Sequence, residues 1–309
     1  MNFTDKEKHY NTLTRYYQYK FNSKIAKISL NAGFGCPNRD GTKGYGGCSF
    51  CSSKGSGDFA GDVNSTLKEQ FETIKQTLIK KWPNAKFMPY LQAFSNTYAN
   101  IDILEKTYNT IINLDEDIVG LGIATRPDCI NLEVANLIKE INKKVPVQLE
   151  LGLQTTNEES MKSLNLGYTL ADFENSINLL KDTGCDIVVH IINGLPNESK
   201  QDMINNIKYL NQYPIKGIKI HSLLIIKNTK LALDYLKEPF KILTLNEYVD
   251  IVCEQIANLR SDIIVHRLAA DSNVADLIEP QWTIKKLVVQ NEIDKELRKR
   301  DLYQGDYNN

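Results

Sequence analysis

The feature that most constrains the fold is a regular alternation of short apolar segments with longer amphipathic segments. The apolar segments are rich in Ile, Val and Leu, as buried strands are, and the segments between them carry apolar residues at helical spacing. Strand–helix units that recur every ~30–35 residues predict a parallel sheet with right-handed crossovers. The predicted strands are residues 25–30, 87–94, 118–124, 147–153, 186–192 and 217–224.

The glycine pattern separates two kinds of parallel sheet. No Gly-x-Gly-x-x-Gly follows the first predicted strand, so a nucleotide-binding Rossmann sheet loses its main support. We therefore expect an α/β fold in which six strands curl into a partial (β/α)6 TIM barrel. Residues 25–225 would form its core, with a short N-terminal extension, 1–24, and a C-terminal extension, 226–309, packed on the core. Residues 263–265, which lead into His266 and Arg267, are a candidate seventh edge strand that faces the substrate.

A glycine-rich loop directly after the first predicted strand carries three cysteines, Cys36, Cys48 and Cys51, in the spacing C-x11-C-x2-C. Three thiolates can hold three irons of a [4Fe–4S] cube and leave the fourth iron for a ligand that is not protein. Structural zinc takes four ligands, commonly as two close pairs, and the chain has no second C-x2-C and no H-x3–5-H. The loop therefore predicts an iron–sulfur cluster with one open iron.

Two alternatives to an enzyme stay open on the residues alone. The first is a zinc-bound structural or RNA-binding module without catalysis. The second is an electron-transfer protein, although that role favours four protein ligands on the cluster. Analysis of iron, sulfide and zinc in anaerobically purified protein separates these cases.

Polar residues follow the other predicted strands at the ends where a partial barrel carries its chemistry. Because the carboxyl ends of parallel strands meet at one edge of the sheet, we expect these side chains to converge on one mouth. The candidates are Gln92 to Asn96, residues 125–128, Glu150, Gln154, His190, residues 194–196 and His221.

Composition bounds the class of protein. With 309 residues, 42% of them hydrophobic and 24% charged, the chain has the composition of a globular protein. No apolar run approaches the ~20 residues that span a bilayer, and the first residues lack the apolar stretch of a signal peptide. Six cysteines, three of them scattered, suit a reducing compartment, so we expect a cytoplasmic protein with no membrane contact. At a net charge of −1, any RNA contact must come from a local patch.

The cysteine loop resembles that of the radical S-adenosylmethionine (SAM) enzymes. Further segments are similar to the YhcC/YtqA-like (MnmL-type) branch of that superfamily, which is related to the catalytic subunit of Elongator. These segments are residues 38–42, 124–128, 150–155, 192–196 and 217–221, and the likeness extends through 264–267 to 294–297. The resemblance therefore covers nearly the whole chain and implies a partial barrel of the radical SAM type.

The resemblance implies two cofactors, a [4Fe–4S] cluster and S-adenosyl-L-methionine. SAM would chelate the open iron, and an electron from the reduced cluster would cleave it to methionine and a 5′-deoxyadenosyl radical. Reduced flavodoxin or ferredoxin is the implied electron donor. The resemblance also implies residues that contact SAM, which are Phe50, Gln92, Phe94, Asn96, Gln154, His190, Gly194 and Pro196.

Two positions depart from the pattern of the relatives. The run Gln92-Ala93-Phe94-Ser95-Asn96 stands where a Gly-Gly-Glu pattern is common. Leu166 stands where relatives commonly have an arginine that could pair with the SAM carboxylate.

The same branch implies tRNA as the substrate. Its wobble uridine would be converted from the 5-carboxymethylaminomethyl to the 5-aminomethyl form by hydrogen abstraction from the carboxymethyl CH₂, oxidation, and hydrolysis of the resulting imine. Arg126 could hold the substrate carboxylate or a phosphate, and Glu150, His221 and His266 are the other predicted catalytic residues. Residues 15–20 are candidates for RNA contact, and so are Lys285, Lys286 and Arg298 to Arg300, for which a solvated helix face is the alternative. Another radical SAM substrate, RNA or small molecule, is the alternative.

Overall fold

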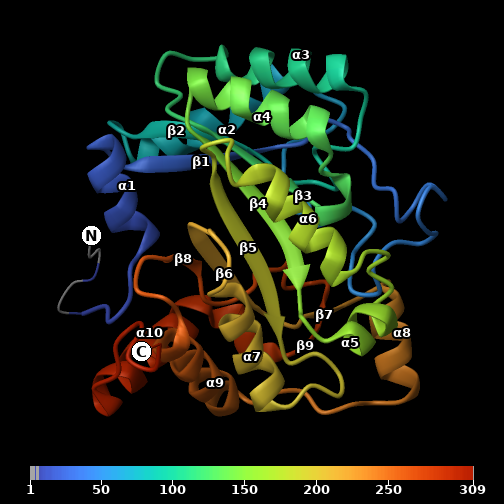
Figure 1. Cartoon of the computed structure of the whole chain (residues 1–309), viewed down its shortest axis with the longest axis vertical. Helices are drawn as coiled ribbons and strands as arrows, with labels where there is room; N and C mark the ends of the chain where they lie inside the picture. The colour runs from blue at the N-terminus through green and yellow to red at the C-terminus, as the bar shows by residue number, and fades with distance from the viewer. Residues whose placement is uncertain (1–3, 5–6, 309) are drawn as a thin grey trace.

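The fold is a half-barrel of seven parallel strands, seen in the computed structural model, which describes residue 4 and residues 7–308. The strands lie side by side in the order in which they occur along the chain, and each neighbouring pair is parallel (Figure 1). They are β1 (Ile25–Leu30), β2 (Lys86–Leu91), β3 (Leu121–Thr125), β4 (Val147–Gln154), β5 (Asp186–Asn193), β6 (Gly217–Ser222) and β8 (Ile264–Arg267). The predicted α/β partial barrel is thus confirmed.

Helices cover the convex face of this sheet, from its first strands to its last. In Figure 1, α2, α3 and α4 lie at the β1–β4 end, and α7, α9 and α10 lie at the β6–β8 end. A small antiparallel pair is formed by β7 (Ile225–Ile226) and β9 (Leu277–Glu279), and two short 3-10 helices span Pro127–Cys129 and Gln281–Lys285. The helices are α1 (Leu13–Phe21), α2 (Leu67–Lys81), α3 (Ile101–Ile112), α4 (Leu132–Lys144), α5 (Glu158–Ser163), α6 (Leu170–Leu180), α7 (Lys200–Leu210), α8 (Lys230–Lys237), α9 (Leu245–Asn258) and α10 (Lys286–Arg300).

The candidate seventh strand is confirmed as β8, which raises the count from the six strands expected for the core to seven. β8 pairs with β6 and comes from the segment that the sequence assigned to a C-terminal extension. A core of residues 25–225 would therefore lack one strand of the sheet. The second strand also ends earlier than predicted, at Leu91 instead of Phe94, and Phe94 itself adopts a positive φ of 60°, outside the β region.

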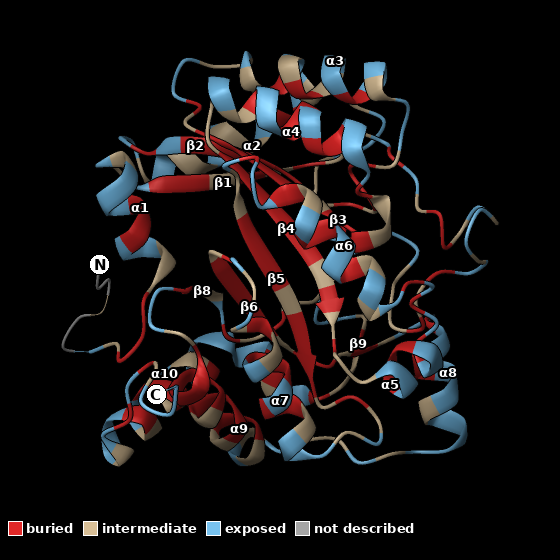
Figure 2. Cartoon of the chain, viewed as in Figure 1, coloured by how far each residue is buried: buried red, intermediate tan, exposed pale blue. Residues whose placement is uncertain are grey.

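Alternation along the strands sorts side chains between the two faces of the sheet. On β1, Ile28 and Leu30 are fully buried against the helices, together with Phe71 of α2. Lys27, directly before Ile28 on the strand, faces the barrel interior, where it meets the side chain of Glu150 on β4. Figure 2 shows this pattern as buried strands and buried inner faces of the surrounding helices. The apolar core thus lies outside the sheet, and the polar groups lie inside the curl.

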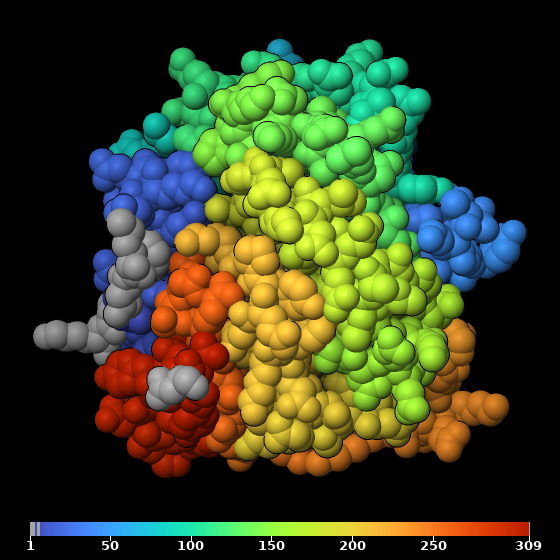
Figure 3. All heavy atoms as spheres, viewed as in Figure 1, coloured from blue at the N-terminus to red at the C-terminus, as the bar shows by residue number. Residues whose placement is uncertain are grey.

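The two chain ends pack against each other beside β8. Helix α1 touches both edge strands, β1 and β8, and so crosses the open side of the half-barrel. In Figure 3 the N-terminal segment, dark blue, and the C-terminal segment, red, lie on the same side of the molecule. The backbone N–H of Gln304 donates to the carbonyl of His9 at 2.9 Å, and the Gln304 side chain accepts from the backbone of Asn11 at 2.8 Å. No helix in the described residues is long and apolar enough to cross a membrane.

Candidate functional site

A cavity of about 590 Å³ opens inside the curl of the sheet, at the carboxyl ends of the strands. Residues of all six strands from β1 to β6, and of β8, line it, with Ala124 and Thr125 coming from β3. The three cysteines of the loop after β1 form part of the same wall. The convergence that parallel strands predict is therefore present, with the cysteines and the polar strand residues around one space.

The cysteine loop is held in place by two asparagines. The side chain of Asn38 donates to the carbonyl of Asn165 at 2.6 Å and points its amide toward the sulfur of Cys48 at 3.7 Å. Asn165 in turn donates to the carbonyl of Gly47 at 2.9 Å. Gly47 has a φ of +82°, which favours glycine, and a Cβ there would lie only 2.9 Å from the Arg39 side chain. The loop is thus fixed by contacts that are far apart in the sequence.

The thiols fit an iron–sulfur cluster. Burial raises the pKa of Cys36 and raises that of Cys48 to about 12, and neighbouring thiolates add to the effect. Iron would displace these protons, since thiolate is the ligand form. No three His, Cys, Asp or Glu side chains in the described ranges are grouped so that they could hold a single metal ion. Three thiols around one cavity suit a cluster, which attaches each to a different iron.

Arg126 lies at the cluster loop, and Asp128 already occupies its guanidinium. The Nε and Nη2 atoms of Arg126 donate to the two carboxylate oxygens of Asp128 at 2.9 and 3.0 Å. Its Nη1 lies 3.9 Å from the sulfur of Cys48, and the guanidinium stacks over the Tyr168 ring at 4.9 Å. The Nε/Nη2 face, one of the two faces of the guanidinium that could hold a substrate carboxylate, is therefore taken. The geometry places Arg126 beside Cys48 of the cysteine loop.

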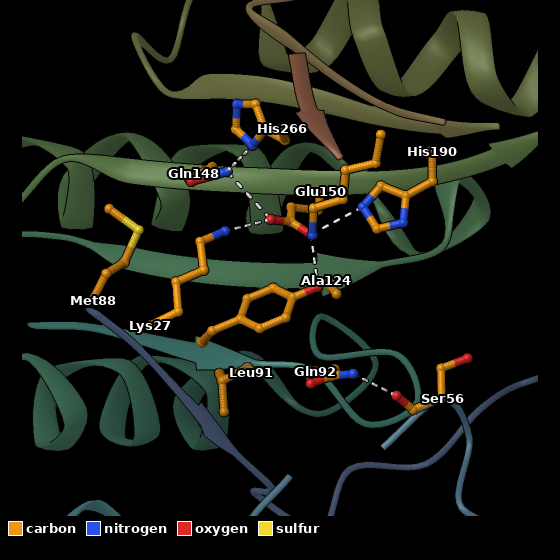
Figure 4. A network of polar contacts seen from close by, with 12 residues as sticks. Lys27, Ser56, Met88, Leu91, Gln92, Ala124, Gln148, Glu150, His190 and His266 are labelled. Atoms are coloured by element: carbon orange, nitrogen blue, oxygen red, sulfur yellow. Dashed lines mark hydrogen bonds and ion pairs between the residues drawn. The ribbon is translucent and has the colours of Figure 1, made fainter. Parts of the chain in front are cut away.

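Glu150 is the centre of a buried polar network (Figure 4). Its side chain is inaccessible to solvent, and it accepts hydrogen bonds from Lys27 at 3.0 Å and from the Tyr90 hydroxyl at 2.6 Å. Lys219 also donates to it, and the His190 ring nitrogen Nε2 lies 2.9 Å away. Burial alone would raise the pKa of Glu150, but Lys219 and Lys27 hold it well below its usual range. Glu150 is therefore an ionised hub that joins β1, β2, β4, β5 and β6.

The histidines of the cavity are neutral, for one shared reason. Burial lowers the pKa of His190 to about 4, and Lys219 adds to the shift. Burial also holds the pKa values of His221 and His266 well below the usual range. His266 Nδ1 lies 3.0 Å from the amide of Gln148, which also donates to Glu150. His221 stacks on His190 with ring centroids 5.1 Å apart.

The predicted site residues divide into two groups. Three lie away from the cavity wall. The amide of Asn96 donates to the carbonyls of Leu91 and Ala124, which fixes the ends of β2 and β3, and Gly194 and Pro196 follow β5 as the chain turns away. The others line the cavity: Cys36, Cys48, Phe50, Cys51, Gln92, Phe94, Arg126, Glu150, Gln154, His190, His221 and His266.

Gln92 and Phe94 line the cavity but also brace the segment that follows Cys51. The amide of Gln92 donates to the carbonyl of Ser56 at 2.8 Å, as Figure 4 shows. The ring of Phe94 lies so close to Gly55 that a Cβ there would be 2.3 Å from it. Leu166 is fully buried in an apolar cluster that Cys48 and Phe50 pack against. Contacts of Gln92, Phe94 and Leu166 thus support the cysteine loop and the segment that follows it.

The sequence did not lead us to predict the two lysines of the Glu150 network, nor the place of Arg267 of β8 in the cavity wall. Lys27, Lys219 and Arg267 all line the cavity. A usable signal exists, because Lys219 and His221 are two residues apart on an apolar strand and must share its inner face. A charged residue within a buried strand needs a partner of opposite charge, and Glu150 is the acidic residue on a buried strand that can pair with Lys219.

The aromatic residues of α1 are not free to stack on RNA bases. Tyr16 and Tyr17 are buried, and their hydroxyls donate to Asp186 at 2.8 Å and to Gln148 at 2.6 Å. The prediction of RNA contact at residues 15–20 is therefore wrong for these two rings. On α10, Arg300 pairs with Asp250 at 2.8 Å and with Glu296, which is the pattern of a solvated face.

Comparisons with known proteins agree with this site. The sequence pattern of the Radical SAM superfamily matches residues 30–210, and that of the Radical_SAM C-terminal domain matches residues 215–299. The chain is 38% identical over 305 residues to the uncharacterized protein YtqA of Bacillus subtilis, covering 99% of this chain and 94% of that protein. It is 30% identical over 279 residues to the protein YhcC of Escherichia coli, covering 90% of this chain and 89% of that one.

More distant similarities reach a larger protein. Elongator complex protein 3 of Dictyostelium discoideum is 27% identical over 157 residues, which is 50% of this chain and 27% of that protein. The solved structure of Elp3 from the archaeon Methanocaldococcus infernus superposes with a TM-score of 0.68 at 17% identity. That superposition covers 91% of this chain and 64% of the archaeal chain, and it shows a shared fold.

Proposed function

Because the chain belongs to the radical SAM superfamily, we propose that it modifies the wobble uridine of tRNA, converting the 5-carboxymethylaminomethyl group to 5-aminomethyl. The chain is a radical SAM enzyme, and its cofactors are a [4Fe–4S] cluster and SAM. When bound, these cofactors supply the 5′-deoxyadenosyl radical that removes a hydrogen atom from the substrate. Cys36, Cys48 and Cys51 would hold the cluster, and reduced flavodoxin or ferredoxin would supply the electron.

The observation that carries the proposal is the charge of the cavity interior. One buried carboxylate, Glu150, is shared by two ammonium groups, those of Lys27 and Lys219, and a third cation, Arg267, lines the same space. Among the described residues, five Lys and Arg side chains and four Asp and Glu side chains line this cavity, and an excess of positive charge suits a substrate that carries an anion. The carboxymethylaminomethyl group carries one.

The cavity wall also offers surfaces for the cofactor and for a flat base. Phe50, between two of the cysteines, and Gln154, at the end of β4, are the residues that we propose to contact SAM. Phe59 lines the mouth and is half exposed, so it is available to stack on a base. Neutral His190 donates to Glu150 and so holds its ring toward the cavity. These residues orient the reactants and exclude water, while the cofactors supply the radical.

Deletion of the gene tests this proposal. Total tRNA from the deletion strain, analysed by nucleoside mass spectrometry, is expected to accumulate 5-carboxymethylaminomethyl-uridines. The 5-aminomethyl and 5-methylaminomethyl forms should disappear, because the step that produces the amine is missing. The measurement is made in a strain that has no second enzyme for this step.

Complementation provides the control for the deletion. Wild-type protein should restore the profile, and the variant Cys36→Ala should not. An unchanged nucleoside profile in the deletion strain would reject tRNA wobble modification, and the radical SAM assignment would then need another substrate.

A further inference from the structure

Arg267 is the last residue of β8, at the open edge of the half-barrel, and it lines the cavity. In the sheet it pairs in register with Lys219 of β6. Within the part of the chain that the structure describes, no hydrogen bond or ion pair involves its guanidinium. A cation held at a cavity wall without a protein partner keeps all of its donors for a ligand.

The other cations of the cavity are all engaged. Lys27 and Lys219 bind Glu150. Arg126 binds Asp128 through two parallel hydrogen bonds. The remaining one, Arg39, donates to the backbone carbonyls of Cys51 and Ser52 at 3.3 and 2.5 Å. Arg267 therefore stands apart in its lack of a partner.

The acid nearest to Arg267 in the sequence is also occupied. Asp271 follows Arg267 by four residues and lines the same cavity, but Lys286 of α10 binds its carboxylate. Asp276 of the same loop also lines the cavity, but within the described residues it forms no ion pair with Arg267. Burial lowers the pKa values of His221 and Lys219, and the positive charge of Arg267 adds to both shifts.

His221 supplies a second free polar atom on the neighbouring strand. Its Nε2 atom is buried and has no hydrogen-bond partner among the described residues. The ring lines the cavity and is held by its stacking on His190. A buried polar atom without a partner costs free energy unless a ligand or water satisfies it. Arg267 and His221 thus offer a charged fork and a neutral ring nitrogen to the same space.

We propose that Arg267, assisted by His221, binds the carboxylate of the substrate and so determines specificity for an acidic side chain on the modified base. This inference rests on the proposed function and assigns to Arg267 the role that the sequence suggested for Arg126. The planar guanidinium can form two parallel hydrogen bonds to a carboxylate, which a neutral isostere of the acid cannot accept in the same charge-assisted form.

The test compares two RNA ligands that differ only at the acid. One is an anticodon stem–loop that carries 5-carboxymethylaminomethyluridine, and the other carries the corresponding primary carboxamide. The wild-type protein is expected to bind the acid more tightly than the amide. Arg267→Gln should weaken binding of the acid by about 10- to 100-fold, the usual range for a charge-assisted pair, and should leave the amide nearly unchanged. Arg267→Lys keeps the charge without the fork and should fall between them.

Two controls separate this role from others. Lys139→Gln removes a cation from the exposed face of α4, outside the cavity wall, and should bind both RNAs like the wild type. Binding of SAM to each variant is measured in parallel, because SAM also carries a carboxylate. The proposal requires that Arg267→Gln bind SAM normally.

Each outcome decides the question. Loss of SAM binding without loss of acid discrimination would overturn the proposal and assign Arg267 to the cofactor. Equal discrimination by Arg267→Gln and wild type would overturn it while leaving the proposed function intact. If the wild type does not prefer the acid-bearing RNA, the inference fails, and an unchanged nucleoside profile in the deletion strain would show separately that the proposed function fails.

Discussion

Replacing any one of Cys36, Cys48 and Cys51 by alanine is expected to abolish formation of 5′-deoxyadenosine. Each thiolate holds a different iron of the cube, so two ligands cannot retain the cluster in the geometry that leaves one iron for SAM. Anaerobically purified wild-type protein should contain about four irons and four sulfides per chain, and each variant should contain far less. The measurements are iron and sulfide analysis and chromatography of the nucleoside product.

Cys185→Ala is the matched control for these variants. Cys185 is half-buried, lies just before β5, and accepts a hydrogen bond from Thr183 at 3.2 Å. It is a scattered cysteine with no place in the cavity wall, so its loss should leave iron content and product formation unchanged. Full iron content in Cys36→Ala or Cys48→Ala would contradict the assignment of the cluster to this loop.

Replacing Glu150 by glutamine is expected to lower the free energy of unfolding by about 3–5 kcal/mol, because it leaves the buried ammonium group of Lys219 without its counter-charge. Lys27 and Lys219 both depend on this carboxylate, and the Tyr90 hydroxyl and His190 share it. Glutamine keeps the shape but removes the charge. Urea denaturation, followed by circular dichroism, measures the change.

A second variant separates a structural role of Glu150 from a catalytic one. In Glu150→Gln/Lys219→Met the cation of β6 is removed together with the carboxylate, so part of the lost stability should return. The sequence suggested Glu150 as a catalytic residue. If Glu150→Gln unfolds like the wild type and loses only product formation, that suggestion holds and the account of Glu150 as a structural hub is wrong.

The order of strands was predictable from the sequence because each strand of a parallel half-barrel is buried on its helix-facing side and is separated by a helix from the next. The segments 25–30 and 147–153 matched almost to the residue, since β1 is Ile25–Leu30 and β4 is Val147–Gln154. β8 contains only four residues, too few for the alternation to be recognised with the same clarity.

The site was predictable only in part, for a physical reason. The spacing of three cysteines in one loop is a local pattern that predicts the cluster ligands directly, and all three cysteines line the cavity. The Glu150 network joins side chains from five strands, so it depends on the register between strands, which sequence patterns do not specify. Arg126 was assigned to the substrate although Asp128, two residues later, was a partner within reach.

The most direct test of the account is a reaction with purified components. Anaerobic protein with a reconstituted cluster, SAM, a chemical reductant and tRNA that carries 5-carboxymethylaminomethyluridine should yield 5′-deoxyadenosine and 5-aminomethyluridine in comparable amounts. Formation of 5′-deoxyadenosine should rise when this tRNA is added. Formation of 5′-deoxyadenosine with no 5-aminomethyluridine, and with no response to the tRNA, would contradict the account.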